Sequence, residues 1–261
     1  MSTADRPVFA PRPAVLGHRG LGKGSVDGLS ENTLPSLLAA ATLGVDWVEL
    51  DVSRSSDGVL VVHHNPAIGD SDFLVDRSAD QLAAQGVPTL AEVLDALPVE
   101  VGVDLDVKTV LEDAPGGWGS GTVAMVAPVL AAEARRRPVL TTSFDVAALL
   151  WLREQVPGLA LGLISWVDFP LRMAVTAAAH LHLDVVALHH GSFGPNRVEG
   201  GPVHRSPARS VEVAHDSGLE VMAWCPGPDA VGPLVAAGVD AVCVNDVPVM
   251  LPLVRAAAGS S

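Results

Sequence analysis

The chain has 261 residues, and 30 acidic against 16 basic side chains give it a formal net charge of -14. This excess of negative charge argues against binding of nucleic acid or of an anionic membrane surface through bulk charge. With 49% apolar and 18% charged residues, the sequence is also too hydrophobic for a disordered protein. Only two of the basic residues are lysines, Lys23 and Lys108, so each of them invites a specific explanation.

Cysteine usage and the N-terminal composition indicate a cytoplasmic protein. Cys225 and Cys243 are too few for a disulfide framework, and their spacing matches no metal-binding motif. Residues 1–13 include three prolines and lack the apolar core of a signal peptide. No apolar run approaches the ~18 residues of a membrane span, so we expect a soluble chain without a stable membrane anchor.

Short runs rich in valine and leucine alternate with alanine- and leucine-rich segments of helical length. The predicted strands are, in order, residues 14–16, 47–52, 101–107, 139–142, 159–163, 185–188, 220–224 and 241–244. The predicted helices lie near residues 33–43, 90–97, 121–136, 145–155, 170–181, 207–217, 229–237 and 247–257. Continuous apolar strands are typical of a parallel sheet covered on both faces. Eight strand–helix units predict an α/β fold, a TIM (β/α)8 barrel, in which residues 1–261 form one domain. The alternative, an open doubly wound sheet that binds a dinucleotide, lacks a G-x-G-x-x-G after the first strand.

The strand-like run at residues 59–63 does not fit this alternation. It begins eight residues after Asp51, whereas a parallel crossover needs about a dozen or more. The intervening Ser55-Ser56-Asp57-Gly58 is a turn signal, so we expect an extra antiparallel strand that extends strand two into a hairpin. This hairpin would return His63 or His64 toward the carboxylates at the end of strand two.

Histidine, arginine and glycine occur together at the end of the first predicted strand, in Gly17-His18-Arg19-Gly20. Barrels carry their functional residues at the C-terminal ends of the strands. The glycines allow a ligand to approach the backbone closely, and arginine can hold a phosphate through two parallel hydrogen bonds. Taken alone, His18 would fit a buried core histidine better than a functional one, but arginine and two glycines beside it favour a site.

Acidic residues occupy alternate positions at the ends of the second and third strands. Glu49 and Asp51 share one face of strand two, about 6.6 Å apart at Cα for a rise of ~3.3 Å per residue. Asp104, Asp106 and Lys108 share one face of strand three in the same way. Paired carboxylates in an apolar strand repel each other unless a positive charge lies between them, and a hard divalent cation suits oxygen ligands. A glycosidase pair is the alternative, although two carboxylates on one strand do not naturally flank a scissile bond from opposite faces.

Together these residues suit phosphate-ester chemistry. A metal ion, Arg19 and Lys108 would neutralise phosphoryl oxygens. A lysine in an apolar strand is costly unless it is paired or bound to an anion. Two histidines can divide the acid and base roles near neutral pH. The sequence has no G-x-S-x-G motif, and neither cysteine has the setting of a thiol nucleophile.

A series of short motifs spans nearly the whole chain. It consists of Gly17-His18-Arg19-Gly20, Glu31-Asn32-Thr33, Val48-Glu49-Leu50-Asp51-Val52, Asp57-Gly58, Val61-Val62-His63-His64-Asn65-Pro66, Pro88-Thr89-Leu90, Asp104–Lys108, Ser143-Phe144, Trp224, Gly238-Val239-Asp240 and Asn245-Asp246-Val247-Pro248. In this order the motifs resemble the glycerophosphodiester phosphodiesterase family.

The resemblance implies a TIM barrel that hydrolyses a small-molecule glycerophosphodiester to glycerol phosphate and an alcohol, with Mg²⁺ or Ca²⁺ as the divalent cation. It also implies catalytic, metal-binding and substrate-binding groups of residues, in that order: His18 and His64; Glu49, Asp51 and Asp106; Arg19, Lys108 and Trp224. Trp224 would line the glycerol side of the pocket. Glu31 and Asn32 are expected either to brace the phosphate loop or to cap the helix that begins near Thr33.

Three departures from the family pattern bear on the substrate. Asp106 stands where the family usually has Glu, as in sphingomyelinase D-type enzymes; His64-Asn65-Pro66 replaces His-Asp-Pro; and Cys225-Pro226-Gly227 replaces Thr-Val-Asn. The alternatives are therefore a lysophospholipase D or sphingomyelinase D-like phosphodiesterase, and a barrel that binds a phosphodiester without cleaving it. The headgroup, the choice between Mg²⁺ and Ca²⁺, the attacking group, the oligomeric state and the roles of His189 and His190 stay open.

Overall fold

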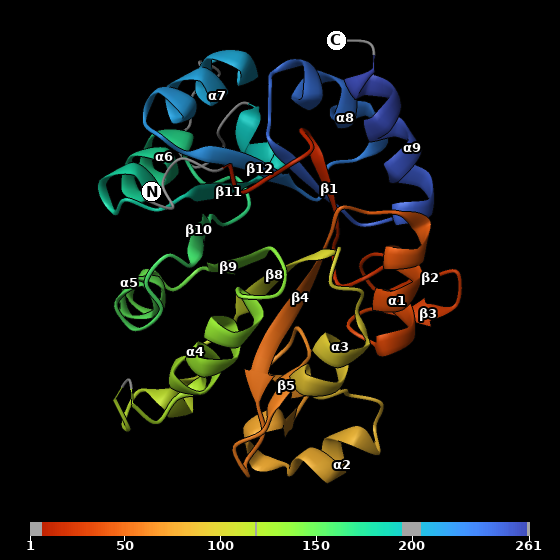
Figure 1. Ribbon diagram of the computed structural model, residues 1–261, viewed down its shortest axis with the longest axis vertical. Coiled ribbons are helices and arrows are strands. Elements are labelled where there is room, and N and C mark those ends of the chain that lie inside the picture. Colours follow the sequence, from red (N-terminus) through yellow and green to blue (C-terminus); the bar gives the residue numbers. More distant parts are fainter. Residues whose placement is uncertain (1–6, 118, 195–204, 260–261) are drawn as a thin grey trace.

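The computed structural model describes residues 7–117, 119–194 and 205–259, and a closed parallel barrel forms its centre (Figure 1). Within these residues eight strands close the barrel in the order β1, β4, β8, β9, β10, β11, β12 and β13, and β13 pairs again with β1. They span Ala14–Gly17, Trp47–Arg54, Gly102–Val107, Val139–Ser143, Ala160–Ile164, Val185–His189, Glu220–Trp224 and Ala241–Val244. The predicted TIM barrel is confirmed, and each predicted strand ends within two residues of its observed bounds.

The extra strand is also present. β5 (Leu60–Val62) pairs antiparallel with β4, with Val62 opposite Val52, and so forms the predicted hairpin. Two further hairpins are short: β2 (Ser25–Val26) with β3 (Leu29–Ser30), and β6 (Ala67–Ile68) with β7 (Asp72–Phe73). Because β5 returns along β4, the segment that follows it reaches the carboxyl end of the barrel.

Helices surround the barrel (Figure 1). They are α1 (Leu34–Leu43), α3 (Leu90–Ala96), α4 (Thr122–Glu133), α5 (Val146–Gln155), α6 (Leu171–His180), α7 (Pro207–Asp216), α8 (Pro228–Ala236) and α9 (Val247–Ala258), at the predicted places. Sequence reasoning missed α2 (Ala79–Ala83), whose five residues are too few for a periodic apolar pattern and which starts at a Ser78 cap. No helix in the described part of the chain has both the length and the apolar character needed to cross a bilayer.

Alternating strand residues separate an outer from an inner apolar layer. Outward side chains such as Val48 and Leu50 pack under the helices, whereas an inner cluster fills the lower part of the barrel. In that cluster Phe9 meets Trp47 edge-on, with ring centroids 5.6 Å apart. Gly102 makes room for the indole, since a Cβ there would lie 2.3 Å from the Trp47 ring. Above this apolar plug the inward positions of β4 and β8 become acidic.

Candidate active site

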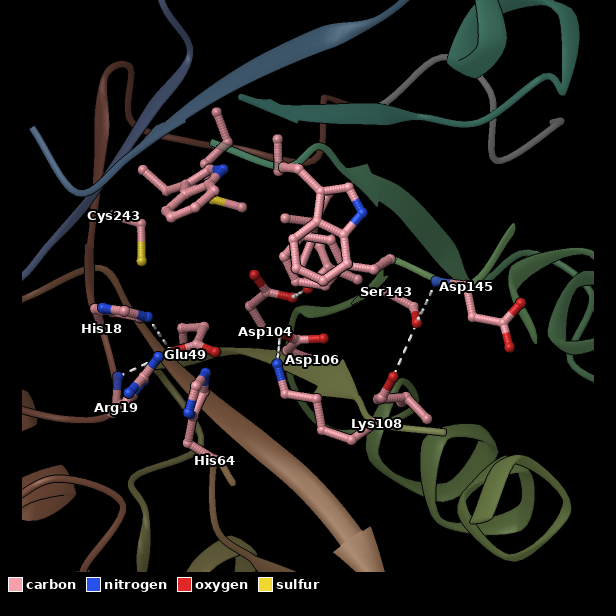
Figure 2. A pocket seen from close by; sticks show the side chains of 18 of the residues that line it. His18, Arg19, Glu49, His64, Asp104, Asp106, Lys108, Ser143, Asp145 and Cys243 are labelled. Atoms are coloured by element: carbon pink, nitrogen blue, oxygen red, sulfur yellow. Dashed lines mark hydrogen bonds and ion pairs between the residues drawn. The ribbon is translucent and has the colours of Figure 1, made fainter. Parts of the chain in front are cut away.

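A cavity of about 680 Å³ lies at the carboxyl ends of the barrel strands, and charged side chains converge on it (Figure 2). Seven of the eight predicted site residues line it: His18, Arg19, Glu49, His64, Asp106, Lys108 and Trp224. The eighth, Asp51, is only 1% exposed and contacts both Arg19 and Lys108. The fold therefore brings together all eight predicted site residues.

Sheet register places the carboxylates at matching heights. Glu49 of β4 lies beside Asp104 of β8, and Asp51 lies beside Asp106. Oxygen atoms of Glu49, Asp51 and Asp106 lie within 4.8 Å of one another, and all three residues are buried. The carboxylates thus form a single acidic cluster, because alternate residues of each strand share one face and the two strands pair in register.

The cluster holds more negative charge than its neighbours can balance. Burial, together with repulsion from Asp51 and Asp106, raises the pKa of Glu49 well above its usual range. Burial also raises the pKa of Asp106 to about 6. At Asp51 burial acts in the same direction, but Lys108 and Arg19 outweigh it and lower the pKa to about 2.

These residues fit a divalent cation. Asp106 Oδ1 is buried and receives no hydrogen bond from any described residue. A hard cation bound by carboxylate oxygens would take up that atom and relieve the repulsion within the cluster. The donor set of three carboxylates suits Mg²⁺, Ca²⁺ or a similar ion, rather than a soft metal that prefers sulfur.

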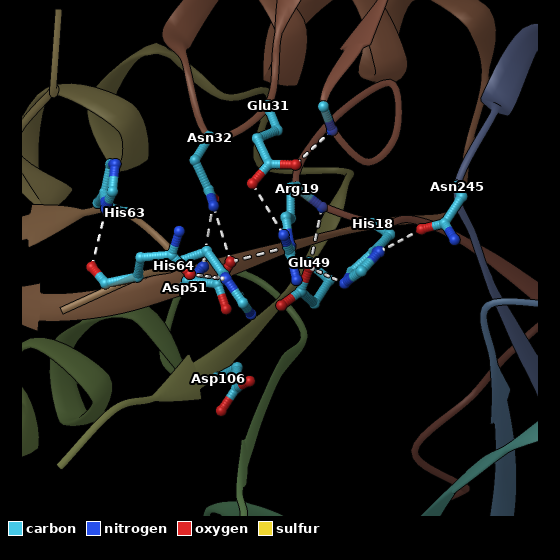
Figure 3. Close-up of polar contacts among 12 residues, drawn as sticks. His18, Arg19, Glu31, Asn32, Glu49, Asp51, His63, His64, Asp106 and Asn245 are labelled. Atoms are coloured by element: carbon cyan, nitrogen blue, oxygen red, sulfur yellow. Dashed lines mark hydrogen bonds and ion pairs between the residues drawn. The ribbon is translucent and has the colours of Figure 1, made fainter. Parts of the chain in front are cut away.

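Arg19 is held in place by three carboxylates (Figure 3). Its backbone N–H donates to Glu49 Oε2 at 2.8 Å, and its Nη1 donates to Glu31 Oε1 at 2.8 Å. Its Nε lies 3.3 Å from Asp51 Oδ2, which also accepts a 2.7 Å hydrogen bond from the Asn32 amide. Glu31 and Asn32 therefore brace the loop, and the alternative expectation that they cap the next helix is wrong.

Lys108 bridges two members of the acidic cluster. Its Nζ lies 2.8 Å from Asp51 Oδ1 and is also bonded to Asp106 Oδ2. Burial disfavours its charge, but Asp106 and Asp51 outweigh burial and raise the pKa of Lys108. The ion pairs with Asp51 and Asp106 thus explain why a lysine occurs at the end of an apolar strand. Lys23, in contrast, is exposed at the cavity rim.

Both histidines contact an asparagine side-chain oxygen through the same ring nitrogen, Nδ1. His18 Nδ1 lies 2.5 Å from Asn245 Oδ1, and His64 Nδ1 lies 2.8 Å from Asn65 Oδ1 (Figure 3). Because an amide oxygen only accepts, each Nδ1 must carry the hydrogen. Nε2 is then the nitrogen that can exchange a proton, and in His18 this atom lies 3.8 Å from Glu49 Oε2.

The hairpin sends its two histidines in different directions, as Figure 3 shows. His64 lines the cavity, and burial lowers its pKa. His63 instead bonds through Nδ1 to the Asn65 carbonyl oxygen at 2.9 Å and is not among the cavity-lining residues. Of the two candidates left open by the hairpin, His64 is the one at the site.

A model of the glycerophosphoryl diester phosphodiesterase family matches residues 18–249, which includes the whole cluster just described. The chain belongs to this family. Among curated relatives, it is 31% identical over 236 residues to the Mycobacterium tuberculosis protein named "Probable glycerophosphodiester phosphodiesterase 2", covering 83% of this chain and 82% of that one.

Two other similar proteins differ in how much of their length matches this chain. A glycerophosphocholine phosphodiesterase of Schizosaccharomyces pombe is 44% identical over 87 residues, which are 32% of this chain but only 7% of that protein. The chain thus spans a small part of the length of that relative. The structure of an Oleispira antarctica phosphodiesterase in complex with the product sn-glycerol-3-phosphate has a TM-score of 0.72 at 21% identity, covering 97% of this chain and 99% of that one. That likeness supports the shared fold.

In the structure, the site of this phosphodiesterase family member also includes residues that sequence reasoning did not assign to it. Asn245 continues the inward row of Ala241 and Cys243 on β13, so strict alternation could have placed it. Cys225 lies with its Sγ 3.3 Å from Asn245 Oδ1. Its backbone is left-handed, at φ 55°, which no local pattern indicates. Asp104 accepts a 2.9 Å hydrogen bond from Thr142, and burial raises its pKa well above the usual range.

Trp224 lies in the cavity wall opposite the acidic cluster. Its indole nitrogen is buried without a hydrogen-bond partner among the described residues. The His189 ring packs edge-on against it, with centroids 4.5 Å apart, and His190 lies next to His189. Neither histidine is a lining residue of the cavity, so His189 contacts the site through Trp224.

Proposed function

We propose that this chain hydrolyses glycerophosphodiesters to glycerol phosphate and an alcohol, as one catalytic domain formed by residues 1–261. The main observation behind this proposal is a pair of histidines beside one buried carboxylate cluster, each with its Nδ1 hydrogen-bonded to an asparagine oxygen. Membership of the phosphodiesterase family and the product complex of the Oleispira antarctica enzyme support the same chemistry. The cytoplasmic location and the lack of nucleic-acid partners stay predictions from composition.

Glu49, Asp51 and Asp106 would hold the divalent cation, with Mg²⁺ and Ca²⁺ as the two candidates. When bound, the cation supplies Lewis-acid neutralisation of charge on the phosphoryl oxygens. Lys108 adds a fixed positive charge on the same side, since two of its three hydrogens serve carboxylates and the third remains for the phosphate. Arg19 contributes positive charge from the other side of the cluster.

His18 and His64 would divide the two proton transfers between their Nε2 atoms. One takes the proton of the attacking hydroxyl group while the other protonates the leaving alkoxide. The fixed Nδ1 hydrogens keep each ring oriented, so that Nε2 faces the cavity in both residues. Trp224 would pack against the glycerol part of the substrate from the opposite wall.

Substitution of each histidine tests this assignment. His18→Ala and His64→Ala should each abolish release of choline from glycerophosphocholine while leaving cation binding intact by titration calorimetry, because neither residue belongs to the carboxylate set. His180→Ala, on the exposed end of α6, is the matched control and should keep full activity. Full activity in both site variants would refute the acid and base roles. Cation-dependent binding of the diester without turnover by the wild-type chain would support the non-catalytic alternative instead.

A further inference from the structure

The active-site cavity has two ends that differ in size and exposure. One end is closed: beyond Trp224 it is lined by Met222, Ala187 and Cys243, which are between 0 and 3% exposed. The other end is open, where Trp166 is 65% and Val167 is 54% exposed. A glycerophosphodiester has one constant glycerol arm and one variable alcohol arm. The closed end suits the small constant arm, so the variable arm belongs at the open end.

The open end continues into a side cavity of about 360 Å³. Thr109 and Asp145 line both spaces, so the side cavity begins immediately beyond Lys108. Val110 and Val123 provide apolar wall, and Ala114, Gly117 and Gly121 complete the backbone-rich part of the lining. An alcohol leaving the phosphate near Lys108 can therefore extend in this direction.

Charge changes sign along this path. The phosphate end carries Arg19 and Lys108, whereas the described lining residues of the side cavity include no basic residue and two acidic ones, Asp113 and Asp145. Asp113 is paired with Arg54 at 2.8 Å, so it contributes little free charge. Asp145 Oδ1 accepts hydrogen bonds from the first turn of α5, and no described residue donates to its Oδ2. Asp145 is thus the available negative charge at the junction of the two cavities.

The residue before Asp145, Phe144, belongs to an aromatic pair that also lines the main cavity. The Phe144 and Trp166 rings are 4.5 Å apart at their centroids and tilted by 32°. Lys108 Nζ already lies 5.6 Å from the centre of the Phe144 ring, which leaves the exposed indole of Trp166 as the aromatic surface for a ligand. Indole binds a weakly hydrated cation more strongly than phenyl does.

We propose that Trp166, Phe144 and Asp145 form the leaving-alcohol subsite and that it selects an alkylammonium headgroup, so that the preferred substrate is a zwitterionic glycerophosphodiester. This inference rests on the proposed hydrolysis. The phosphate of such a substrate meets the cationic end, and its ammonium group meets the indole face and the free oxygen of Asp145. A neutral polyol headgroup gains less, because the walls around it are largely apolar.

Competing substrates test the subsite. We expect kcat/KM for glycerophosphocholine to exceed that for glycerophosphoglycerol about tenfold in the wild-type chain. Trp166→Ala and Asp145→Asn should each remove most of this ratio by lowering kcat/KM for the choline diester, with the value for the glycerol diester nearly unchanged. Asn still caps a helix well, so Asp145→Asn preserves the start of α5. Trp166→Phe should restore part of the ratio.

Asp216→Asn, at the end of α7, removes the same charge far from the cavity and is the matched control. A wild-type chain that cleaves both diesters equally well would overturn the subsite and leave the hydrolysis standing. Equal losses for both substrates in Trp166→Ala would also overturn it, since they would place this end of the cavity against the constant glycerol arm. A wild-type chain that cleaves neither diester with Mg²⁺ or Ca²⁺ would overturn the proposed function, and the subsite with it.

Discussion

The hydrogen bond between His18 and Asn245 is the contact whose removal has the most informative consequence. Asn245→Ala deletes the oxygen that accepts the His18 Nδ1 hydrogen at 2.5 Å. The Cys225 sulfur, 3.5 Å from Nδ1, cannot replace it fully because a thiol is only a weak acceptor. The ring is then free to rotate and to carry its hydrogen on Nε2, where it cannot accept a proton.

The expected loss follows from the charge that His18 carries during catalysis. As proposed base or acid, the ring is an imidazolium in one of its two states, and a hydrogen bond to a charged group is worth about 1.5–3 kcal/mol. At about 1.4 kcal/mol per tenfold, kcat should fall by roughly 10- to 140-fold. KM should change little, because Asn245 is not a lining residue of the cavity.

Steady-state choline release from glycerophosphocholine measures both constants, and nitrogen NMR of the histidine rings reports the tautomer of His18. Asn245→Asp, which keeps an oxygen acceptor at the same position, is the matched variant and should retain most of kcat. The loss of one partly buried hydrogen bond should lower Tm by only about 2–4 °C. A kcat within twofold of wild type in Asn245→Ala, with His18 still protonated at Nδ1, would refute the reasoning.

Three further outcomes follow from the same geometry. Asn65→Ala should lower kcat with little change in KM, as it removes the acceptor 2.8 Å from His64 Nδ1, and an unchanged kcat would show that this ring needs no such support. Cation affinity measured by calorimetry should be at least about fourfold weaker at pH 5.5 than at pH 7.5. The pKa of Asp106 is raised to about 6, so this carboxyl group must lose a proton before it can bind the cation at the lower pH. Equal affinity at both pH values would contradict the shift. Gly102→Ala should destabilise the fold by about 3 kcal/mol, seen as a lower Tm, because its Cβ would lie 2.3 Å from the Trp47 ring. The control is Gly232→Ala in α8, where a Cβ would meet no atom within 4 Å, so that Tm should be unchanged or slightly higher.

Much of this fold was predictable because its signals are local. The barrel strands are short apolar runs, and the antiparallel hairpin follows from a link of Ser55 to Gly58 that is too short for a crossover. Strand alternation placed Glu49 and Asp51 on one face, and the same rule placed Asp106 and Lys108 together. The short α2 was missed because five residues provide no periodicity.

The amino-acid sequence by itself determined the barrel, the face on which each carboxylate lies and the need of Lys108 for a partner, since these depend on residue spacing along single strands. Only the tertiary structure decided which residues meet across the barrel mouth. His18 and Asn245 are 227 positions apart, and their contact depends on closure of β1 against β13. The contact of Cys225 with Asn245 and the stacking of Trp166 on Phe144 likewise join loops that follow different strands. Contacts of this kind depend on strand register and ring closure, which no stretch of the chain encodes on its own.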